Sequence, residues 1–285
     1  NSQLDLSGAT CLVELCLKNV TISSISLSQY TKLKSLTQLQ SLTLDDVKLD
    51  DGELDLSGAT SLSHLCLRRV TTSRISLSQC KQLKNLTLKV VKLGDGKLDL
   101  SVTTCLTCLW LEEITISSII LSQCTQLHTL TLMNVKLVDS KLDLSGYTCL
   151  SKLHMEEVNM SNISLSQCTQ LQRVTLQDIQ LGDGKLDLSS ATYLSELCLK
   201  NVTTTCISLS QCIWLQKLRL EHVNLVDGKV DISGAIWLFE LVLENINTLS
   251  ISLSQNMLQR LKLKGFKLVD DKLDTSVLPV HLNSV

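Results

Sequence analysis

The chain has 285 residues, of which 44% are hydrophobic and only 3% are aromatic. The formal net charge of −2 and the pI of about 6.2 argue against a general nucleic-acid-binding protein, because such proteins present basic surfaces. No apolar stretch reaches the ~20 residues that a membrane-spanning helix needs, so we expect no membrane insertion of this segment. The composition suits one elongated domain with a continuous aliphatic core.

A 44-residue repeat runs along the chain. The tetrapeptide Leu-Asp-Leu-Ser, or a close variant of it, begins at Leu54, Leu98, Leu142, Leu186, Val230 and Leu273. Each repeat contains two half-units, called A and B, of which residues 62–70 and 83–93 are examples. A repeat of this length predicts a stacked solenoid, in which each unit buries its apolar face against its neighbours.

Both half-units fit the pattern L-x-x-L-x-L-x-x-(N/C)-x-L at every position but one. About twelve copies, spaced mostly 21 to 23 residues apart, make the chain resemble the leucine-rich-repeat superfamily. The resemblance implies a single leucine-rich-repeat solenoid over residues 1–285, of the α/β class by convention but here mostly β, with a parallel concave sheet. Residues 276–285 are expected to form a degenerate C-terminal end. Because the chain begins in mid-repeat, we also expect a missing N-terminal module.

The departing position is the column that holds Asn or Cys in the superfamily. Here it holds Val, Ile or Phe, as at Val70 and Val91, so a buried asparagine ladder is excluded. Buried turn backbone still needs hydrogen-bond partners. We expect an unbroken serine column, which includes Ser57, Ser101 and Ser189, to supply them. The alternative is that this column simply tolerates a small residue.

A second alternation of apolar and polar residues precedes each of these serines. It reads Leu-Asp-Leu in A units and Ile-Ser-Leu in most B units, a period of two that predicts a short strand. Each turn of the solenoid should then carry two strands, with parallel sheets on both sides of a leucine core. On the convex side we expect short strands or irregular turns, with few or no helices. The alternation keeps the convex aspartates apart, and we interpret them as a solvated structural face.

The twelve cysteines bear on the cellular compartment. One column holds four of them: Cys80, Cys124, Cys168 and Cys212. Successive members lie two rows, or about 9.6 Å, apart, which is beyond disulfide range. We expect all the thiols to be free, which favours a cytoplasmic protein. Five N-x-S/T sequons, which begin at Asn19, Asn85, Asn159, Asn162 and Asn201, favour instead a secreted or cell-surface protein.

No set of residues has the spacing of a catalytic or metal site. The five histidines lack metal-ligand spacing with one another and with the cysteines. Cys105 and Cys108 form a lone C-x-x-C pair, but they fall in different repeat columns. The sequence therefore predicts a protein that is not an enzyme and that has no cofactor and no metal.

The positions around each Leu-x-Leu motif are the candidates for a binding surface. Their central column holds mostly Cys and Thr, and Trp110, His154 and Arg219 interrupt it. Basic and acidic bands flank that column, and Trp and Arg often dominate the energetics of interfaces. The candidate partner-binding residues are Arg68, Arg69, Trp110, Glu112, Met133, His154, Glu156 and Arg219. The alternative is that drift at solvated positions produced the bands.

Three possible functions remain open. The alternating repeat types and the free cysteines resemble the ligand-sensing C-terminal repeats of NOD-like innate immune receptors, although those repeats are usually longer and carry convex helices. This resemblance implies a cytoplasmic receptor region that binds a protein or microbial ligand on its concave face. The alternatives are a secreted or surface recognition protein, akin to Toll-like ectodomains or lymphocyte-receptor-like proteins, and an intracellular scaffold or inhibitor. No specific nucleic acid is expected as a partner, and the oligomeric state stays open.

Overall fold

The computed structural model describes residues 11–22, 25–26, 36–49, 52–137, 141–144, 146–160, 162–181, 186–248, 257–265 and 267–268. The chain divides into two compact units, Asn1–Asp139 and Ser140–Val285. In the described residues the only helix is the three-residue 3-10 helix η1, Leu36–Gln38. No helix in that part of the chain is long and apolar enough to cross a membrane. Parallel strands therefore make up almost all of the regular structure.

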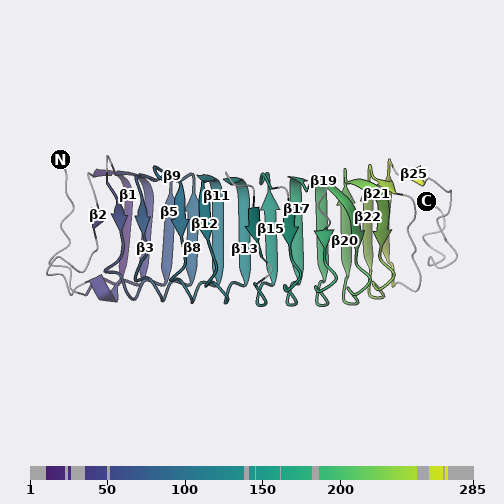
Figure 1. Ribbon diagram of the computed structural model, residues 1–285, viewed down its shortest axis with the longest axis horizontal. Helices are drawn as coiled ribbons and strands as arrows, with labels where there is room; N and C mark the ends of the chain where they lie inside the picture. The colour runs from purple at the N-terminus through teal and green to yellow at the C-terminus, as the bar shows by residue number, and fades with distance from the viewer. Residues whose placement is uncertain are drawn as a thin grey trace. The chain divides into compact units, whose positions relative to one another are not determined.

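In the described part of the first unit, six parallel strands form what we call the long-strand sheet (Figure 1). They are β1 Glu14–Ile22, β3 Ser41–Leu49, β5 His64–Arg68, β8 Asn85–Lys89, β11 Cys108–Ile116 and β13 Thr129–Leu137. Each carries one Leu-x-Leu motif, and neighbouring motifs pair in register, as Leu65 does with Leu86 and Leu86 with Leu109. Two short strands, β6 Thr71–Thr72 and β9 Lys92–Leu93, pair with each other beyond β5 and β8.

Short strands from the Leu-Asp-Leu and Ile-Ser-Leu segments form separate parallel sheets in the same unit. One contains β2 Ile25–Ser26, β4 Leu54–Asp55 and β7 Ile75–Ser76, and another contains β10 Lys97–Asp99 and β12 Ser118–Ile120. Asp55 pairs with Ser76, and Asp99 pairs with Ile120, so an aspartate has no aspartate beside it in these pairs. The prediction of two sets of parallel strands around a leucine core is confirmed.

The second unit repeats this plan. Its long-strand sheet contains β15 Lys152–Glu156, β17 Arg173–Gln180, β19 Glu196–Ser208, β20 Lys217–Glu221, β22 Glu240–Glu244 and β24 Arg260–Lys264. Its other strands are β14 Lys141–Asp143, β16 Asn162–Ser164, β18 Leu186–Asp187, β21 Asn224–Asp231, β23 Asn247–Thr248 and β25 Lys267–Leu268. The long strand β19 takes part in both sets of strands. Its first part pairs with the long strands β17 and β20, and its last part pairs with β18 and β21.

Aliphatic columns fill the core of each unit. Leu42 and Leu44 are 0% exposed, whereas the intervening Thr43 is partly exposed, as the alternation along a strand requires. The column that lacks asparagine is also buried, with Val47 and Val70 at 0%. Burial of each such side chain stabilises the fold by about 1.5–3 kcal/mol relative to leaving it in water. Compared with asparagine, valine in this column makes no side-chain hydrogen bonds to the turn backbone but adds apolar packing to the core.

A buried column forms the turns that lead into the long strands, and all of its residues except Tyr147 are small or contain sulfur. It reads Ala59, Cys80, Thr103, Cys124, Tyr147, Cys168, Ala191, Cys212 and Ala235. Each backbone N–H in this column donates to the carbonyl three residues earlier. In the B rows the thiol also reaches the preceding row, since Cys80 Sγ lies 3.4 Å from the Leu56 carbonyl oxygen. The thiols of these cysteines therefore link successive turns, because each contacts a backbone carbonyl of the preceding row.

The serine column has a different role from the one expected in the A rows. The N–H groups of Ser57 and Ser101 donate to the aspartate two residues earlier, at 3.0 and 2.9 Å. The hydroxyls of Ser189 and Ser233 donate to the corresponding aspartates at 2.6 and 2.7 Å. Hydrogen bonds from the hydroxyl and the N–H of Ser101 lower the pKa of Asp99. The hydroxyls of Ser101, Ser189 and Ser233 thus bind the aspartates of the short strands, so the expectation that the serine hydroxyls satisfy buried turn backbone was wrong for these three rows.

One residue in each long-strand row adopts the left-handed backbone conformation, directly before the column that holds Val or Ile in most rows. These residues are Asn19, Asp46, Arg69, Val90, Glu113, Asn134, Glu157, Asp178, Asn201, His222, Asn245 and Gly265. Asn, Asp and Gly accept this conformation readily, whereas a β-branched residue there is an outlier. The row-to-row hydrogen bonds continue at this position, since the Val90 N–H donates to the Glu112 carbonyl at 2.8 Å. The left-handed residue therefore changes the direction of the backbone without the loss of the hydrogen bond between rows.

Replacing Val90 by Asn should raise the free energy of unfolding by about 1 kcal/mol, because Asn tolerates a φ of 54° at lower cost. Little packing is lost, since Val90 is 38% exposed. The change is measured as a shift of the midpoint of urea unfolding. The matched control is Asn134→Val, at a φ of 50° in another row, which should lower the midpoint. A Val90→Asn protein less stable than the unmodified chain would contradict this account.

Thiol reactivity should follow burial. Desolvation raises the pKa of Cys80 and of Cys212 to about 12, whereas Cys11 and Cys16 are exposed. Iodoacetamide at about pH 8 should therefore alkylate Cys11 and Cys16 in the folded protein and leave Cys80 and Cys212 unmodified until denaturant is added. Peptide mass spectrometry measures the four rates. Equal labelling of Cys80 and Cys16 in the folded protein would show that the turn column is not buried.

Candidate functional site

A three-residue cluster around Trp110 occupies the outer face of the long-strand sheet in the first unit. Trp110 lies between the two leucines of the Leu-x-Leu motif on β11, in register with Thr87 on β8 and Thr131 on β13. Lys89 Nζ lies 4.1 Å from the centroid of the indole ring, within the range of a cation–π interaction. The indole Nε1 donates to Glu112 Oε2 at 3.0 Å, and Lys89 Nζ lies 2.9 Å from the same oxygen. The three side chains therefore hold one another in place.

These contacts change the expectation for Trp110. Its side chain was expected to be exposed, but it is only partly exposed, because Lys89 covers the ring. A hydrogen bond from the Lys89 ammonium lowers the pKa of Glu112, and the indole hydrogen bond adds to this effect. Glu112 therefore stays ionised at neutral pH. The cluster offers a partner an ordered ring edge beside a fixed ion pair.

The two arginines of the basic band differ in their surroundings. Arg68 ends β5, is exposed and lies in register between Asp45 on β3 and Lys89 on β8. Arg69 follows in the left-handed position and donates to Asp45, with its Nε 4.0 Å from Asp46 Oδ2. Arg68 therefore extends the Lys89 side of the cluster. Arg69 is paired with the acidic residues Asp45 and Asp46 on β3.

Met133 completes the part of the predicted site that lies in the first unit. Its backbone pairs with Glu112, and its side chain is partly exposed on β13. Adjacent strands thus bring Trp110, Glu112 and Met133 together, with Lys89 as a fourth member that was not among the predicted residues. The remaining predicted residues lie in the second unit.

In that second unit, His154 and Glu156 lie on one face of β15, two residues apart. His154 Nε2 is 3.8 Å from Glu156 Oε2, so the two form an ion pair only when the imidazole is protonated. Arg219 lies three long strands away, on β20, beyond β17 and β19. Its Nη atoms lie 3.6 Å from Glu221 and 3.4 Å from Glu240. His154 and Glu156 are thus neighbours, whereas Arg219 belongs to a separate ion-pair network.

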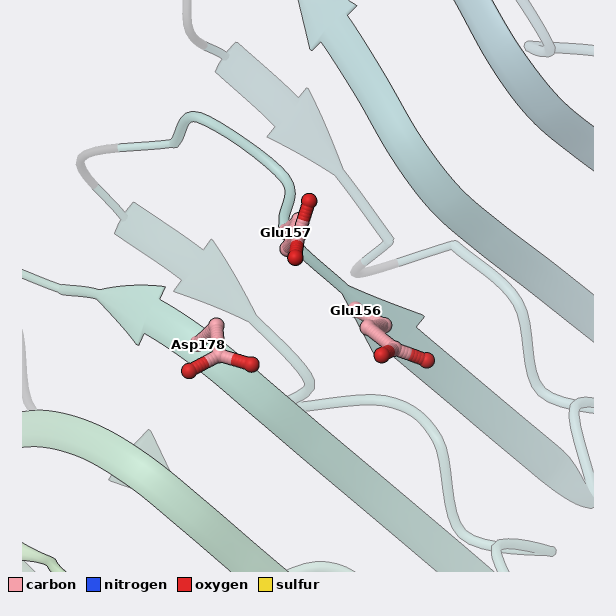
Figure 2. Close-up of side chains that lie close together, drawn as sticks. All are labelled: Glu156, Glu157 and Asp178. Carbon is pink, nitrogen blue, oxygen red and sulfur yellow. The ribbon is translucent and has the colours of Figure 1, made fainter.

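Figure 2 shows three carboxylates where β15 and β17 lie side by side: Glu156, Glu157 and Asp178. One oxygen of each lies within 4.8 Å of the others. Gln177 Nε2 donates to both Glu156 and Asp178 at 2.9 Å. Asn201 Nδ2 donates to Asp178 at 2.6 Å, which lowers the pKa of that carboxyl. Oxygen ligands of this kind suit hard divalent cations, but amide donors already satisfy two of the three carboxylates here.

An aromatic pair that the sequence analysis did not select lies in the second unit. Trp214 and Trp237 have ring centroids 6.3 Å apart and ring planes 6° from parallel. Both are nearly half exposed, at 47% and 45%. They occupy a different, exposed column, the position directly before the first leucine of a row. Gln82 and Gln126 stand at this position in earlier rows. A comparison of that column along the chain would have revealed them, because polar residues give way there to indoles.

No protein-family model matches this chain, and no curated protein matches it in sequence. Several solved structures are similar to it in fold. The functional domain of InlJ from Listeria monocytogenes, which includes a cysteine ladder, is similar over 96% of this chain and 58% of its own, with 20% identity and a TM-score of 0.62. A leucine-rich-repeat protein from Leptospira interrogans is similar over 86% and 64%, with 20% identity and a TM-score of 0.68.

A plant peptide hormone receptor, RGFR1, solved in complex with RGF2, is similar over 90% of this chain and 52% of its own, with 16% identity and a TM-score of 0.58. The chain therefore spans between about half and two thirds of the length of these proteins. At such low identities the likeness concerns the fold. Together with the repeat pattern, it shows that this chain folds as a leucine-rich-repeat solenoid.

Proposed function

We propose that this chain is a non-enzymatic recognition module that binds a protein partner on the outer face of its long-strand sheet, the face expected to be concave. The observation that carries the proposal is the cluster of Lys89, Trp110 and Glu112. A partly exposed indole, fixed by a cation and a carboxylate, loses little conformational entropy when a partner covers it. Indole side chains also contribute more to interfaces than most others.

The surroundings of the cluster support a protein partner. Neighbouring positions present Thr87, Thr131 and Met133, which offer hydroxyl and thioether contacts at strand spacing. Arg68, Lys89 and Glu112 are register neighbours on β5, β8 and β11, so cations and a carboxylate lie next to one another beside the ring and can fix the orientation of a partner. The similar plant receptor is a peptide-binding protein by its description. These features suit recognition of a folded or extended polypeptide.

We further propose that the module is the ligand-sensing region of an innate immune receptor and acts in the cytoplasm. The twelve free cysteines support this setting, because thiols persist in a reducing compartment. The ligand would be a protein or a microbial molecule that displays a protein-like surface. The experiment below tests the binding face itself and does not depend on the compartment.

Selection of a phage-displayed random peptide library on the immobilised protein should yield binders that depend on Trp110. Replacing Trp110 by Ala should weaken such binders by about 2 kcal/mol or more, roughly 30-fold in Kd, because the ring contact is lost. Surface plasmon resonance measures the affinities. The matched control is Thr131→Ala on the neighbouring strand, which should change Kd by less than about threefold.

Circular dichroism and the urea midpoint should show that both variants remain folded. Binders that are indifferent to Trp110→Ala would remove this face from the proposal. A Trp110→Ala protein that unfolds would show instead that the indole is part of the core; in that case Lys89→Ala, which removes the cation from the ring, tests the same cluster.

A further inference from the structure

An exposed apolar column runs along the last rows of the second unit. The turn residue before the first leucine of a row is Tyr193, Trp214, Trp237 and Met257 in four successive rows. Their exposed fractions are 53%, 47%, 45% and 56%. Ile213 and Ile236 add to the column, each 43% exposed. Large apolar side chains grouped in this way at a protein surface mark an interaction site more often than scattered ones do.

Part of this column lines a hollow of about 260 Å³. The hollow is bounded by Trp237, Phe239 and Met257 and by the amides of Gln216 and Gln259. Its walls are therefore aromatic and thioether surfaces with two amide groups, and they include no ionisable side chain. A volume of this size accommodates one large apolar side chain rather than a whole folded element.

The hollow adjoins a charged surface on strands β20, β22 and β24. Phe239 directly precedes β22, and the guanidinium of Arg260 on β24 lies 5.8 Å from its ring centroid. Arg260 also lies 3.7 Å from Glu240, so the same cation contacts the aromatic wall and the ion-pair network. The apolar hollow and the charged surface are thus continuous through Arg260.

In this network the cations project and the carboxylates lie beneath them. Arg260, Lys262 and Lys264 are 72%, 60% and 65% exposed, whereas their partners Glu240 and Glu244 are 18% and 15% exposed. Hydrogen bonds from Lys264 and Lys262 lower the pKa of Glu244 to about 2, so that carboxylate stays ionised. An approaching molecule therefore meets N–H donors first.

The net charge of this surface is modest. Strands β20, β22 and β24 carry five cations (Lys217, Arg219, Arg260, Lys262 and Lys264) and three glutamates, an excess of two positive charges. A nucleic acid requires many phosphate contacts from an unneutralised basic surface. A ligand with a few carboxylates beside one large apolar group matches the small positive excess and the apolar hollow better than a nucleic acid does.

We propose that this surface binds an extended acidic peptide segment of a protein partner, in which a large apolar side chain lies among carboxylates. The apolar side chain enters the hollow between Trp237 and Met257, and the neighbouring carboxylates accept hydrogen bonds from Arg260 and Lys262. The proposal rests on the proposed role as a protein-binding module, and it adds a second surface and the chemistry of its partner. It uses no residue of the Trp110 cluster.

The chain has three tryptophans, one in the first cluster and two beside the hollow, which allows each surface to report separately. In a Trp110→Phe protein, indole fluorescence comes only from Trp214 and Trp237. Titration with a synthetic peptide of alternating Glu and Phe should shift this fluorescence saturably. A Lys/Phe peptide and a Glu/Ser peptide of the same length should each bind at least tenfold more weakly.

Two substitutions locate the binding. Met257→Ala removes a wall of the hollow, and Arg260→Glu reverses the bridging charge; each should weaken the Glu/Phe peptide at least tenfold. Tyr193→Ala is the matched control, because Tyr193 belongs to the same column but does not line the hollow. Both altered side chains are more than half exposed, so the fold should persist, and circular dichroism checks this.

Equal binding of the Lys/Phe peptide, or indifference to Met257→Ala and Arg260→Glu, would overturn the proposal. Tighter binding of a single-stranded oligonucleotide than of the Glu/Phe peptide would also overturn it in favour of a nucleic-acid surface. A library that yields no Trp110-dependent binder would refute the first face alone. A peptide that fails to shift Trp214 and Trp237 would refute the second alone.

Discussion

The structure depends on one constraint, the in-register parallel pairing of equivalent positions in successive rows. Leu65 pairs with Leu86 and Leu86 with Leu109, so each buried column is continuous and each leucine packs on its own equivalent. The same pairing brings polar groups of the turns together row after row, and each must find a partner. The Cys80 thiol meets the Leu56 carbonyl for this reason. The left-handed residue recurs for the same reason, because the backbone must change direction at the same point in every row.

Register also explains why function can vary on this scaffold. Positions between the leucines face outward and contribute little to the core, so their side chains interact mainly with neighbours one row away. Lys89, Trp110 and Glu112 form a cluster only because β8 and β11 are aligned. Arg260, Glu240 and Phe239 meet for the same reason on β22 and β24. A binding surface here is a matter of which side chains occupy adjacent rows, whereas the backbone stays the same.

Periodicity predicted the strands, the leucine columns, the two sets of sheets and the free cysteines, because each depends only on spacing along the chain. It also placed Trp110, Glu112 and Met133 on neighbouring strands. It did not predict that Lys89 would cover the Trp110 ring, because that contact depends on side-chain rotamers. The predicted role of the serines was wrong, because the aspartate two residues earlier accepts the hydrogen bond from the serine hydroxyl. The pairing of Trp214 with Trp237 was not predicted, because periodicity concerns residues that recur, whereas the two indoles depart from the Cys, Ser or Gln that precedes the first leucine in most earlier rows.

The alternation of aspartate with other residues on the short strands has an evolutionary consequence. Asp55 lies beside Ser76 and Asp187 beside Ser208, so the A and B rows are electrostatically distinct although their leucines are interchangeable. Loss of a B half-unit or gain of an A half-unit by unequal recombination would place two aspartates side by side at about 4.8 Å, where like charges repel. Loss or gain of a whole 44-residue unit would keep every aspartate beside a neutral residue. Changes in length by whole 44-residue units should therefore be tolerated better than the gain of an A row or the loss of a B row alone.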